Sequence, residues 1–131
     1  MLRQHVFSGS PYEPMFGISR AVRVGPHVYV TATAPIGTDG KTVGVGNAEA
    51  QARRVFEIIS KALSEVGAAM DDVVRARTFL TDIADWKAVG KVHGEVFAKA
   101  RPASLFVEVN RFIDPDWLVE IEVEAIVEDA P

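Results

Sequence analysis

Apolar and polar residues alternate along several stretches of the chain, and this alternation predicts strands. From Val28 to Ala34 every second residue is apolar, and Gly25-Pro26 separates this run from a shorter one. Alternation of this kind is typical of strands that bury one face, and a turn dipeptide between two of them predicts a hairpin. The expected strands cover residues 19–24, 27–34, 73–81, 104–109 and 118–125, with a further N-terminal strand expected at residues 4–7.

A helical repeat of apolar positions separates these groups of strands. Apolar residues recur every three or four positions between Asn47, which can cap a helix start, and Gly67, which can end the helix. A second helix is predicted over residues 84–100, with Trp86, Val89, Val92, Val96 and Phe97 on its apolar side. Gly90 and Gly94 lie inside it, and each costs about 1 kcal/mol of helix propensity relative to Ala. We therefore expect a backbone or a ligand to approach closely there.

The resulting order, β-β-α-β-α-β-β, predicts a single α+β domain over residues 1–131. Two helices cannot cover both faces of a sheet of five or six strands, so we expect both on one face. The opposite face would carry Tyr29, Thr31, Thr33, Arg75, Arg77, Phe79, Ser104, Phe106, Glu120, Glu122 and Glu124. This mixture of charged and aromatic side chains fits a subunit interface, and an ordinary solvated sheet face is the alternative.

Composition narrows the class of protein. Of the 131 residues, 48% are hydrophobic and 24% are charged, which is enough apolar material for a packed core. Cysteine is absent, which excludes disulfides and thiolate chemistry. The net charge of −4 argues against nucleic-acid binding, because such proteins usually present a basic surface. The apolar runs are too short for a transmembrane helix and no signal sequence is recognisable, so we expect a cytoplasmic location without membrane contact.

Candidate catalytic groups are few. His5, His27 and His93 lack metal-ligand spacing, so no metal is expected, and His93 is interpreted as a helix-surface or interface residue. No phosphate-binding loop or Gly-x-Ser-x-Gly motif is present. The three alternating glutamates allow two interpretations. They either pair with arginines of a neighbouring strand, or one of them lies in a cleft with a raised pKa and handles a proton.

Short motifs are distributed along the whole chain: Gly17-Ile18-Ser19-Arg20-Ala21-Val22, Thr31-Ala32-Thr33-Ala34-Pro35, Glu49-Ala50-Gln51-Ala52-Arg53, Asp71-Asp72-Val73-Val74-Arg75, Phe79-Leu80-Thr81-Asp82, Pro102-Ala103 and Leu118-Val119-Glu120-Ile121-Glu122. In order and spacing they resemble the Rid family, the reactive-intermediate (enamine/imine) deaminases also called YjgF or L-PSP proteins. The resemblance implies a chorismate-mutase-like α+β fold with two helices on one face of the sheet. It also implies a homotrimer that binds a small molecule in clefts between subunits, without a cofactor.

The resemblance also implies the positions of site residues. Active family members carry Pro-Ala-Arg-Ser, whose arginine holds the substrate carboxylate, whereas this chain has Ser104 at the arginine position. The family's cleft glutamate matches Glu120, although the alternating tail also allows Glu122. The expected site therefore has Glu120 as the catalytic residue and Ile18, Arg20, Gly90, Ser104 and Phe106 as substrate-binding residues. Ile18 and Gly90 stand where the family has a tyrosine and an asparagine, and Arg20, Arg101 or Arg111 could supply a displaced cation.

Three functions follow as hypotheses from this altered motif. The first is a divergent enzyme that hydrolyses an imine or enamine to a carbonyl compound and ammonia but does not prefer small 2-imino acids. The second is a non-catalytic small-molecule-binding trimer. The third is the endoribonuclease activity implied by the name L-PSP, which the acidic charge balance disfavours.

Overall fold

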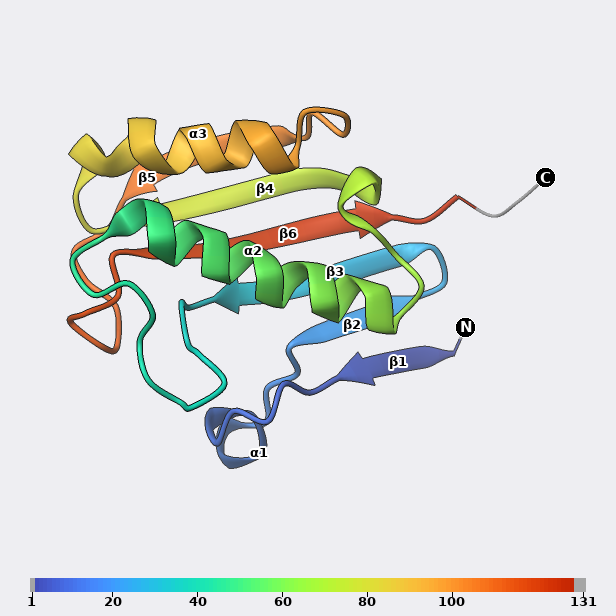
Figure 1. Cartoon of the computed structure of the whole chain (residues 1–131). Helices are drawn as coiled ribbons and strands as arrows, with labels where there is room; N and C mark the ends of the chain where they lie inside the picture. Colours follow the sequence, from blue (N-terminus) through green and yellow to red (C-terminus); the bar gives the residue numbers. More distant parts are fainter. Residues whose placement is uncertain (1, 129–131) are drawn as a thin grey trace.

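Six strands form one mixed sheet in the computed structural model, which describes residues 2–128 (Figure 1). The sheet order is β1-β2-β3-β6-β4-β5. Every neighbouring pair is antiparallel except β4 and β5, which are parallel. The α+β class, the N-terminal strand and the first hairpin are thereby confirmed. The strands are β1 (Arg3–Val6), β2 (Ala21–Val24), β3 (His27–Thr33), β4 (Val73–Leu80), β5 (Ala103–Glu108) and β6 (Val119–Ile126).

Two helices, α2 (Ala48–Glu65) and α3 (Trp86–Val96), cover one face of this sheet, as predicted (Figure 1). The structure adds a short helix α1 (Tyr12–Phe16) near β1, which the sequence analysis missed because five residues are too few for a helical repeat to emerge. Two short 3-10 segments, η1 (Met70–Asp72) and η2 (Ile83–Asp85), precede β4 and α3. The α-helical part of the second predicted helix is therefore shorter than residues 84–100. No helix within residues 2–128 is long and apolar enough to cross a bilayer.

The ends of α2 follow the predicted local signals. The Asn47 side-chain oxygen accepts a hydrogen bond from the Ala50 N–H at 3.0 Å, and Gly67 follows the helix with a φ of 76°. Between these ends, Val55, Ile59 and Leu63 are fully buried against the sheet. The apolar repeat therefore faces the core, as the spacing predicted.

The prediction that the Ser104 and Phe106 side chains of β5 lie on the open face of the sheet was wrong. In the parallel register with β4, Ser104 lies opposite Ala76 and Phe106 opposite Thr78, both of which are buried beneath the helices. Ser104 and Phe106 therefore lie on the helix side, and Leu105 and Val107 take the open face. Alternation specifies which residues share a face, but it does not specify which face is buried.

Two register shifts moved further residues from their predicted faces. One shift lies between Val30 and Thr33 of β3, and it leaves Thr33 only 1% exposed instead of on the open face. The other lies between Val73 and Arg75 of β4, so that Val73 is buried and Val74 is exposed. Such bulges change the alternation of side chains within a strand.

The predicted apolar side of the second helix needs a further correction. Val89, Val92 and Phe97 are buried, but Trp86 at the start of α3 is 49% exposed. Trp86 is the first residue of α3, and only the later positions Val89 and Val92 of the helix are buried in the core. The remaining positions confirm the predicted direction of the helix face.

Candidate functional site

A groove of about 670 Å³ runs between α1, α2 and the start of β6. Three predicted site residues line it together: Ile18 and Arg20, which both precede β2, and Glu120 on β6. Ile18 is 39% exposed and supplies an apolar wall. The structure thus brings together three of the six predicted residues, although they come from opposite ends of the chain.

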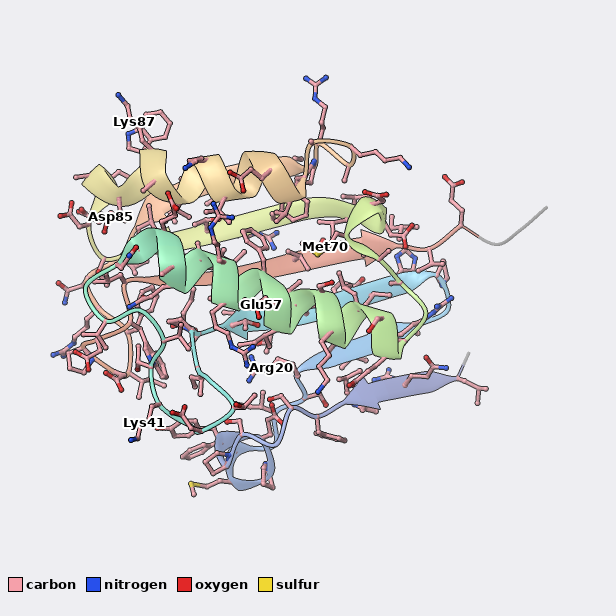
Figure 2. All side chains as sticks on the ribbon, viewed as in Figure 1. Arg20, Lys41, Glu57, Met70, Asp85 and Lys87 are labelled. Atoms are coloured by element: carbon pink, nitrogen blue, oxygen red, sulfur yellow. The ribbon has the colours of Figure 1, made fainter. Side chains whose placement is uncertain are left out.

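Arg20 is held in place by a buried carboxylate. Glu13 on α1 is 2% exposed and forms an ion pair with Arg20 Nη2 at 3.3 Å. The guanidinium also donates to the Ala32 carbonyl at 3.2 Å and to Thr33 Oγ1 at 3.3 Å. In the view of Figure 2, the Arg20 side chain lies below α2. Because its charge is matched by Glu13, Arg20 does not act as a free cation in the groove.

Glu13 is a further site residue that the sequence analysis missed. Burial raises the pKa of its carboxyl, but hydrogen bonds from Ser8 and the charge of Arg20 outweigh burial and leave the pKa below its ordinary value. Glu13 lies on the short helix α1, which carries no apolar repeat. Nothing in the sequence pattern distinguished this glutamate from a surface residue.

Glu120 has the opposite electrostatic environment. Burial raises the pKa of its carboxyl, and the charge of Arg20 offsets only part of this effect. Within residues 2–128 no hydrogen bond or ion pair is formed by the Glu120 side chain. A half-buried carboxyl group without a partner retains its capacity to accept a proton.

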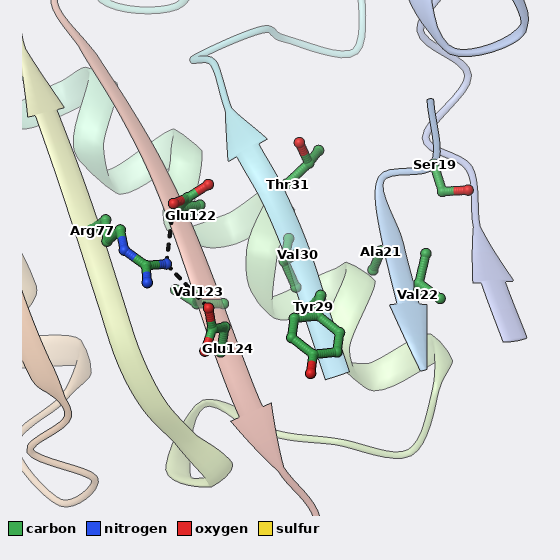
Figure 3. Close-up of a pocket in the computed structure, with 10 residues that line it drawn as sticks. All are labelled: Ser19, Ala21, Val22, Tyr29, Val30, Thr31, Arg77, Glu122, Val123 and Glu124. Carbon is green, nitrogen blue, oxygen red and sulfur yellow. Dashed lines mark hydrogen bonds and ion pairs between the residues drawn. The ribbon is translucent and has the colours of Figure 1, made fainter. Parts of the chain in front are cut away.

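The two other glutamates of β6 lie in a separate depression on the open sheet face (Figure 3). Arg77 Nη1 contacts Glu122 at 3.2 Å and Glu124 at 3.1 Å, which confirms the predicted cross-strand pairing for this arginine. Tyr29 lies beside them and is 49% exposed. The sequence left Glu120 and Glu122 as alternatives, and the structure distinguishes them: Glu120 lines the groove, whereas Glu122 forms an ion pair with Arg77.

The remaining three predicted residues lie together elsewhere, where α3 packs on β5. The side chain of Ser104 is hydrogen bonded to His93, with 2.8 Å between Ser104 Oγ and His93 Nε2. The His93 ring packs 5.4 Å from the ring of Phe106, measured between centroids. Gly90 lies one helical turn before His93, and a Cβ atom built there would meet only Phe106 Cζ, at 4.0 Å. The close approach expected at Gly90 is therefore not made by any of the residues 2–128.

His93 was not predicted as a site residue, although the structure places it beside three that were. Burial lowers the pKa of its imidazole, which favours the neutral ring. Its pairing with Ser104 depends on how α3 packs over β5, so the sequence carried no signal for it.

The cations suggested as replacements for the missing arginine are arranged differently from the expectation. Arg101 and Arg111 do not line the groove, whereas Arg54 and Lys61 of α2 do. Arg54 donates to the Ile36 carbonyl at 2.8 Å and pairs with Glu57 at 3.5 Å. Among residues 2–128, no group of three or more His, Cys, Asp or Glu side chains could hold a metal ion.

Comparison with known proteins places this arrangement in a family. A family model described as Endoribonuclease L-PSP matches residues 10–127. The chain belongs to this family, which is also called the YjgF or Rid family. The resemblance recognised from the short motifs is thereby confirmed.

Individual relatives cover nearly the whole Rid domain. A 3-aminoacrylate deaminase RutC of Acinetobacter baylyi is 38% identical over 112 residues, which are 86% of this chain and 83% of the relative. The crystal structure of a YjgF family member from Mycobacterium tuberculosis is 44% identical, covers 96% of this chain and 100% of its own, and superposes with a TM-score of 0.87. A Rid family protein of Yersinia pestis is 28% identical, with coverage of 96% and 100% and a TM-score of 0.86.

Proposed function

We propose that this protein hydrolyses a small imine or enamine to a carbonyl compound and ammonia. The observation that carries the proposal is Glu120, a half-buried carboxyl group with a raised pKa and no partner among the described residues. The name of the RutC relative, a 3-aminoacrylate deaminase, supports the same reaction class, because 3-aminoacrylate is an enamine. Neither a metal nor an organic cofactor is required for this chemistry.

The proposed reaction adds water across a carbon–nitrogen double bond. An enamine first takes a proton on carbon to become an imine, and water then adds to the imine carbon. Glu120 accepts a proton from this water as the new carbon–oxygen bond forms, and the imine nitrogen takes up a proton, which gives a carbinolamine. The Glu120 carboxyl group then returns its proton to the amino nitrogen. The carbon–nitrogen bond breaks as the hydroxyl group loses its proton, which releases ammonia and the carbonyl compound. A raised pKa makes the carboxylate a stronger base near neutral pH, and a positioned base contributes about 10²- to 10⁴-fold in rate.

The substrate is proposed to differ from small 2-imino acids. Ser104 stands where the family motif has an arginine, and a neutral hydroxyl cannot form the bidentate ion pair that holds a carboxylate. Losing such a charged pair in a desolvated cleft costs about 2–5 kcal/mol, or roughly 30-fold to several thousand-fold in rate. We expect little hydrolysis of 2-imino acids formed in place by an amino-acid oxidase, and a gain of this activity in Ser104→Arg.

We further propose that the complete site forms between subunits of a homotrimer. Within one chain the expected residues fall into two groups, Ile18, Arg20 and Glu120 in the groove and Gly90, Ser104 and Phe106 at the α3–β5 edge. A cleft between subunits would combine one group from each of two neighbours. The open sheet face supports this assembly, since Tyr29, Leu105 and Val107 expose 49%, 41% and 40% of their surface beside charged groups. Sedimentation should give the mass of three chains, and a monomer would contradict the proposal.

A matched pair of variants tests the role of Glu120. In Glu120→Gln the side chain keeps its shape but cannot accept a proton, so ammonia release from an active imine should fall at least about 100-fold. Its thermal unfolding should be unchanged or slightly raised, because burial disfavours the ionised carboxyl at neutral pH. The control Glu122→Gln removes a partner of Arg77 and should leave turnover per folded subunit unchanged.

The same experiment separates the alternative functions. A non-catalytic binder, which the missing arginine favours, would retain its ligand in the wild-type protein without releasing ammonia. Ammonia release that persists in Glu120→Gln would refute the catalytic assignment. Cleavage of RNA by the wild-type protein would instead favour the endoribonuclease activity in the family's name, against the net charge of −4.

A further inference from the structure

The paired side chains of His93 and Ser104 form a polar surface at the α3–β5 edge. Ser104 is exposed on the edge strand β5, and His93 reaches it from α3 with 2.8 Å between Ser104 Oγ and His93 Nε2. Ser104 Oγ is also 3.2 Å from the Pro102 carbonyl oxygen. Ser104 stands where the family motif has an arginine, so the hydrogen-bonding capacity of Ser104 and its partner His93 determines what the protein can hold there.

Two glycines leave open space beside this pair. Gly90 is a neighbour of both His93 and Gly94 on the surface of α3, because residues three and four positions apart are neighbours on a helix. A Cβ atom at Gly94 would meet nothing within 4 Å, and one at Gly90 would only touch Phe106. An alanine would therefore fit at either position without a clash within residues 2–128. Each glycine nevertheless lowers the stability of the helix by about 1 kcal/mol relative to alanine. The missing side chains leave room for a ligand next to His93 and Ser104.

Ser104 can only accept a hydrogen bond from such a ligand. Its hydroxyl has a single proton, which goes either to His93 Nε2 or to the Pro102 carbonyl oxygen. In the first case His93 is the acceptor, and in the second its Nε2–H donates to Ser104. In both cases the proton is used within the protein, and Ser104 Oγ keeps a free lone pair. A ligand that contacts Ser104 must therefore supply an N–H or O–H donor.

The surroundings of the pair also disfavour an anion. The His93 ring packs against Phe97 and Phe106, with centroid distances of 4.8 and 5.4 Å. These apolar rings desolvate the imidazole and favour its neutral form, as the lowered pKa of His93 indicates. A carboxylate at this site would meet a neutral imidazole and a hydroxyl group whose proton is already used, so neither group would compensate its charge. It also has no proton to donate to Ser104.

From this geometry we infer that His93 and Ser104 bind the uncharged, hydrogen-bond-donating end of the ligand, a primary amide or a hydroxyl group. This inference rests on the proposed function, because it names the substrate class: a carbonyl compound, imine or enamine that carries an amide or hydroxyl where relatives with the arginine take a carboxylate. Ser104 is then a specificity-determining residue, and His93 positions it.

Binding of three matched probes tests the inference without requiring turnover. The probes are 2-oxobutanamide, methyl 2-oxobutanoate and 2-oxobutanoate, which share a carbon chain and differ in donor capacity and charge. The readout is the NMR resonance of the His93 ring, assigned from a His93→Gln variant, with His5 and His27 as internal references. We expect the amide to shift the His93 resonance and to bind about tenfold more tightly than the ester or the carboxylate, equivalent to about 1.4 kcal/mol.

Two variants connect this binding to the proposed contacts. Ser104→Ala should weaken binding of the amide roughly fivefold to tenfold, the effect of one lost hydrogen bond, and leave the ester unchanged. Gly94→Leu should fill the space beside His93 and abolish binding of all three probes, while Gly94→Ala serves as the control. The trimeric mass of each variant is checked by sedimentation.

The outcomes separate this inference from the proposed function. Tighter binding of the carboxylate or the ester, equal affinities in wild type and Ser104→Ala, or failure of every probe to perturb His93 would overturn the inference. If the amide binds as expected but no imine is hydrolysed, the ligand assignment stands and the catalytic proposal fails. If imines are hydrolysed with a preference for the carboxylate compound, the catalytic proposal stands and this inference fails.

Discussion

Replacing Glu13 with Gln tests how much the buried ion pair contributes to the groove. Glu13 is 2% exposed, and its carboxylate receives hydrogen bonds from the Ser8 N–H at 2.8 Å and from Arg20 Nε at 3.3 Å. In Glu13→Gln the guanidinium of Arg20, which is 14% exposed, loses its negative partner. Breaking a fully buried pair costs about 3–5 kcal/mol, and partial exposure of Arg20 lowers the expected loss to about 2–4 kcal/mol.

The pH dependence of this loss follows from the pKa of Glu13. Burial raises this pKa, but the hydrogen bonds from Ser8 and the charge of Arg20 prevail and hold it below its ordinary value of 4.5. An ionised Glu13 therefore stabilises the folded chain at every pH above 4.5, and this contribution is lost as the pH falls through the lowered pKa. The stability difference between wild type and Glu13→Gln should be largest near neutral pH and should shrink in acid.

Urea unfolding at fixed protein concentration, at pH 7 and at several acidic pH values, measures this difference. Glu95→Gln is the matched control, because Glu95 contacts Arg53 at a shorter distance of 2.8 Å but both side chains are more than 40% exposed. Exposed pairs contribute about 0.2–1 kcal/mol, so burial rather than distance should decide which variant loses more. Equal losses for the two variants at pH 7, or a Glu13→Gln loss that does not shrink in acid, would refute this reasoning.

Two further predictions concern backbone conformation and an unpaired hydroxyl. Gly44→Ala should lose more stability than Gly46→Ala: both residues have positive φ, but a Cβ atom at Gly44 would lie 2.8 Å from the Ala50 Cβ, whereas one at Gly46 meets nothing within 4 Å. Thermal unfolding of both variants measures the difference, and equal losses would contradict it. Thr78→Val should raise the free energy of unfolding by about 1 kcal/mol, because Thr78 Oγ1 is buried without a hydrogen-bond partner among the described residues. A lower midpoint in urea would indicate that this hydroxyl is satisfied.

Local signals in the sequence were sufficient for the helices and for most strands. The helix from Asn47 to Gly67 has a capping side chain, a regular apolar repeat and a glycine with positive φ after its end, and each of these signals involves residues only a few positions apart. The hairpin around Gly25-Pro26 is equally local. Interactions of this kind depend on neighbours in the chain, so the sequence displays them directly.

The sequence alone did not determine which face of each strand is buried. Ser104 and Phe106 alternate correctly with Leu105 and Val107, but the parallel pairing with β4 turns them toward the helices. The bulge in β3 likewise turned Thr33 away from its predicted place on the open face and into the core. A period of two has two possible phases, and contacts with neighbouring strands select one of them.

The same distinction between local sequence signals and tertiary contacts applies to the candidate site. A serine at position 104, where the family resemblance implies an arginine, and a glutamate at position 120 were both visible in the sequence. Tertiary structure decided that Glu120 rather than Glu122 lines the groove, that Glu13 neutralises Arg20, and that His93 meets Ser104. Whether each glutamate is buried or ion-paired depends on the side chains that neighbouring strands place around it. The His93–Ser104 contact depends on how α3 packs over the edge strand β5. Residue identity and period are properties of the linear chain, whereas burial, charge pairing and hydrogen bonding arise only once distant segments meet.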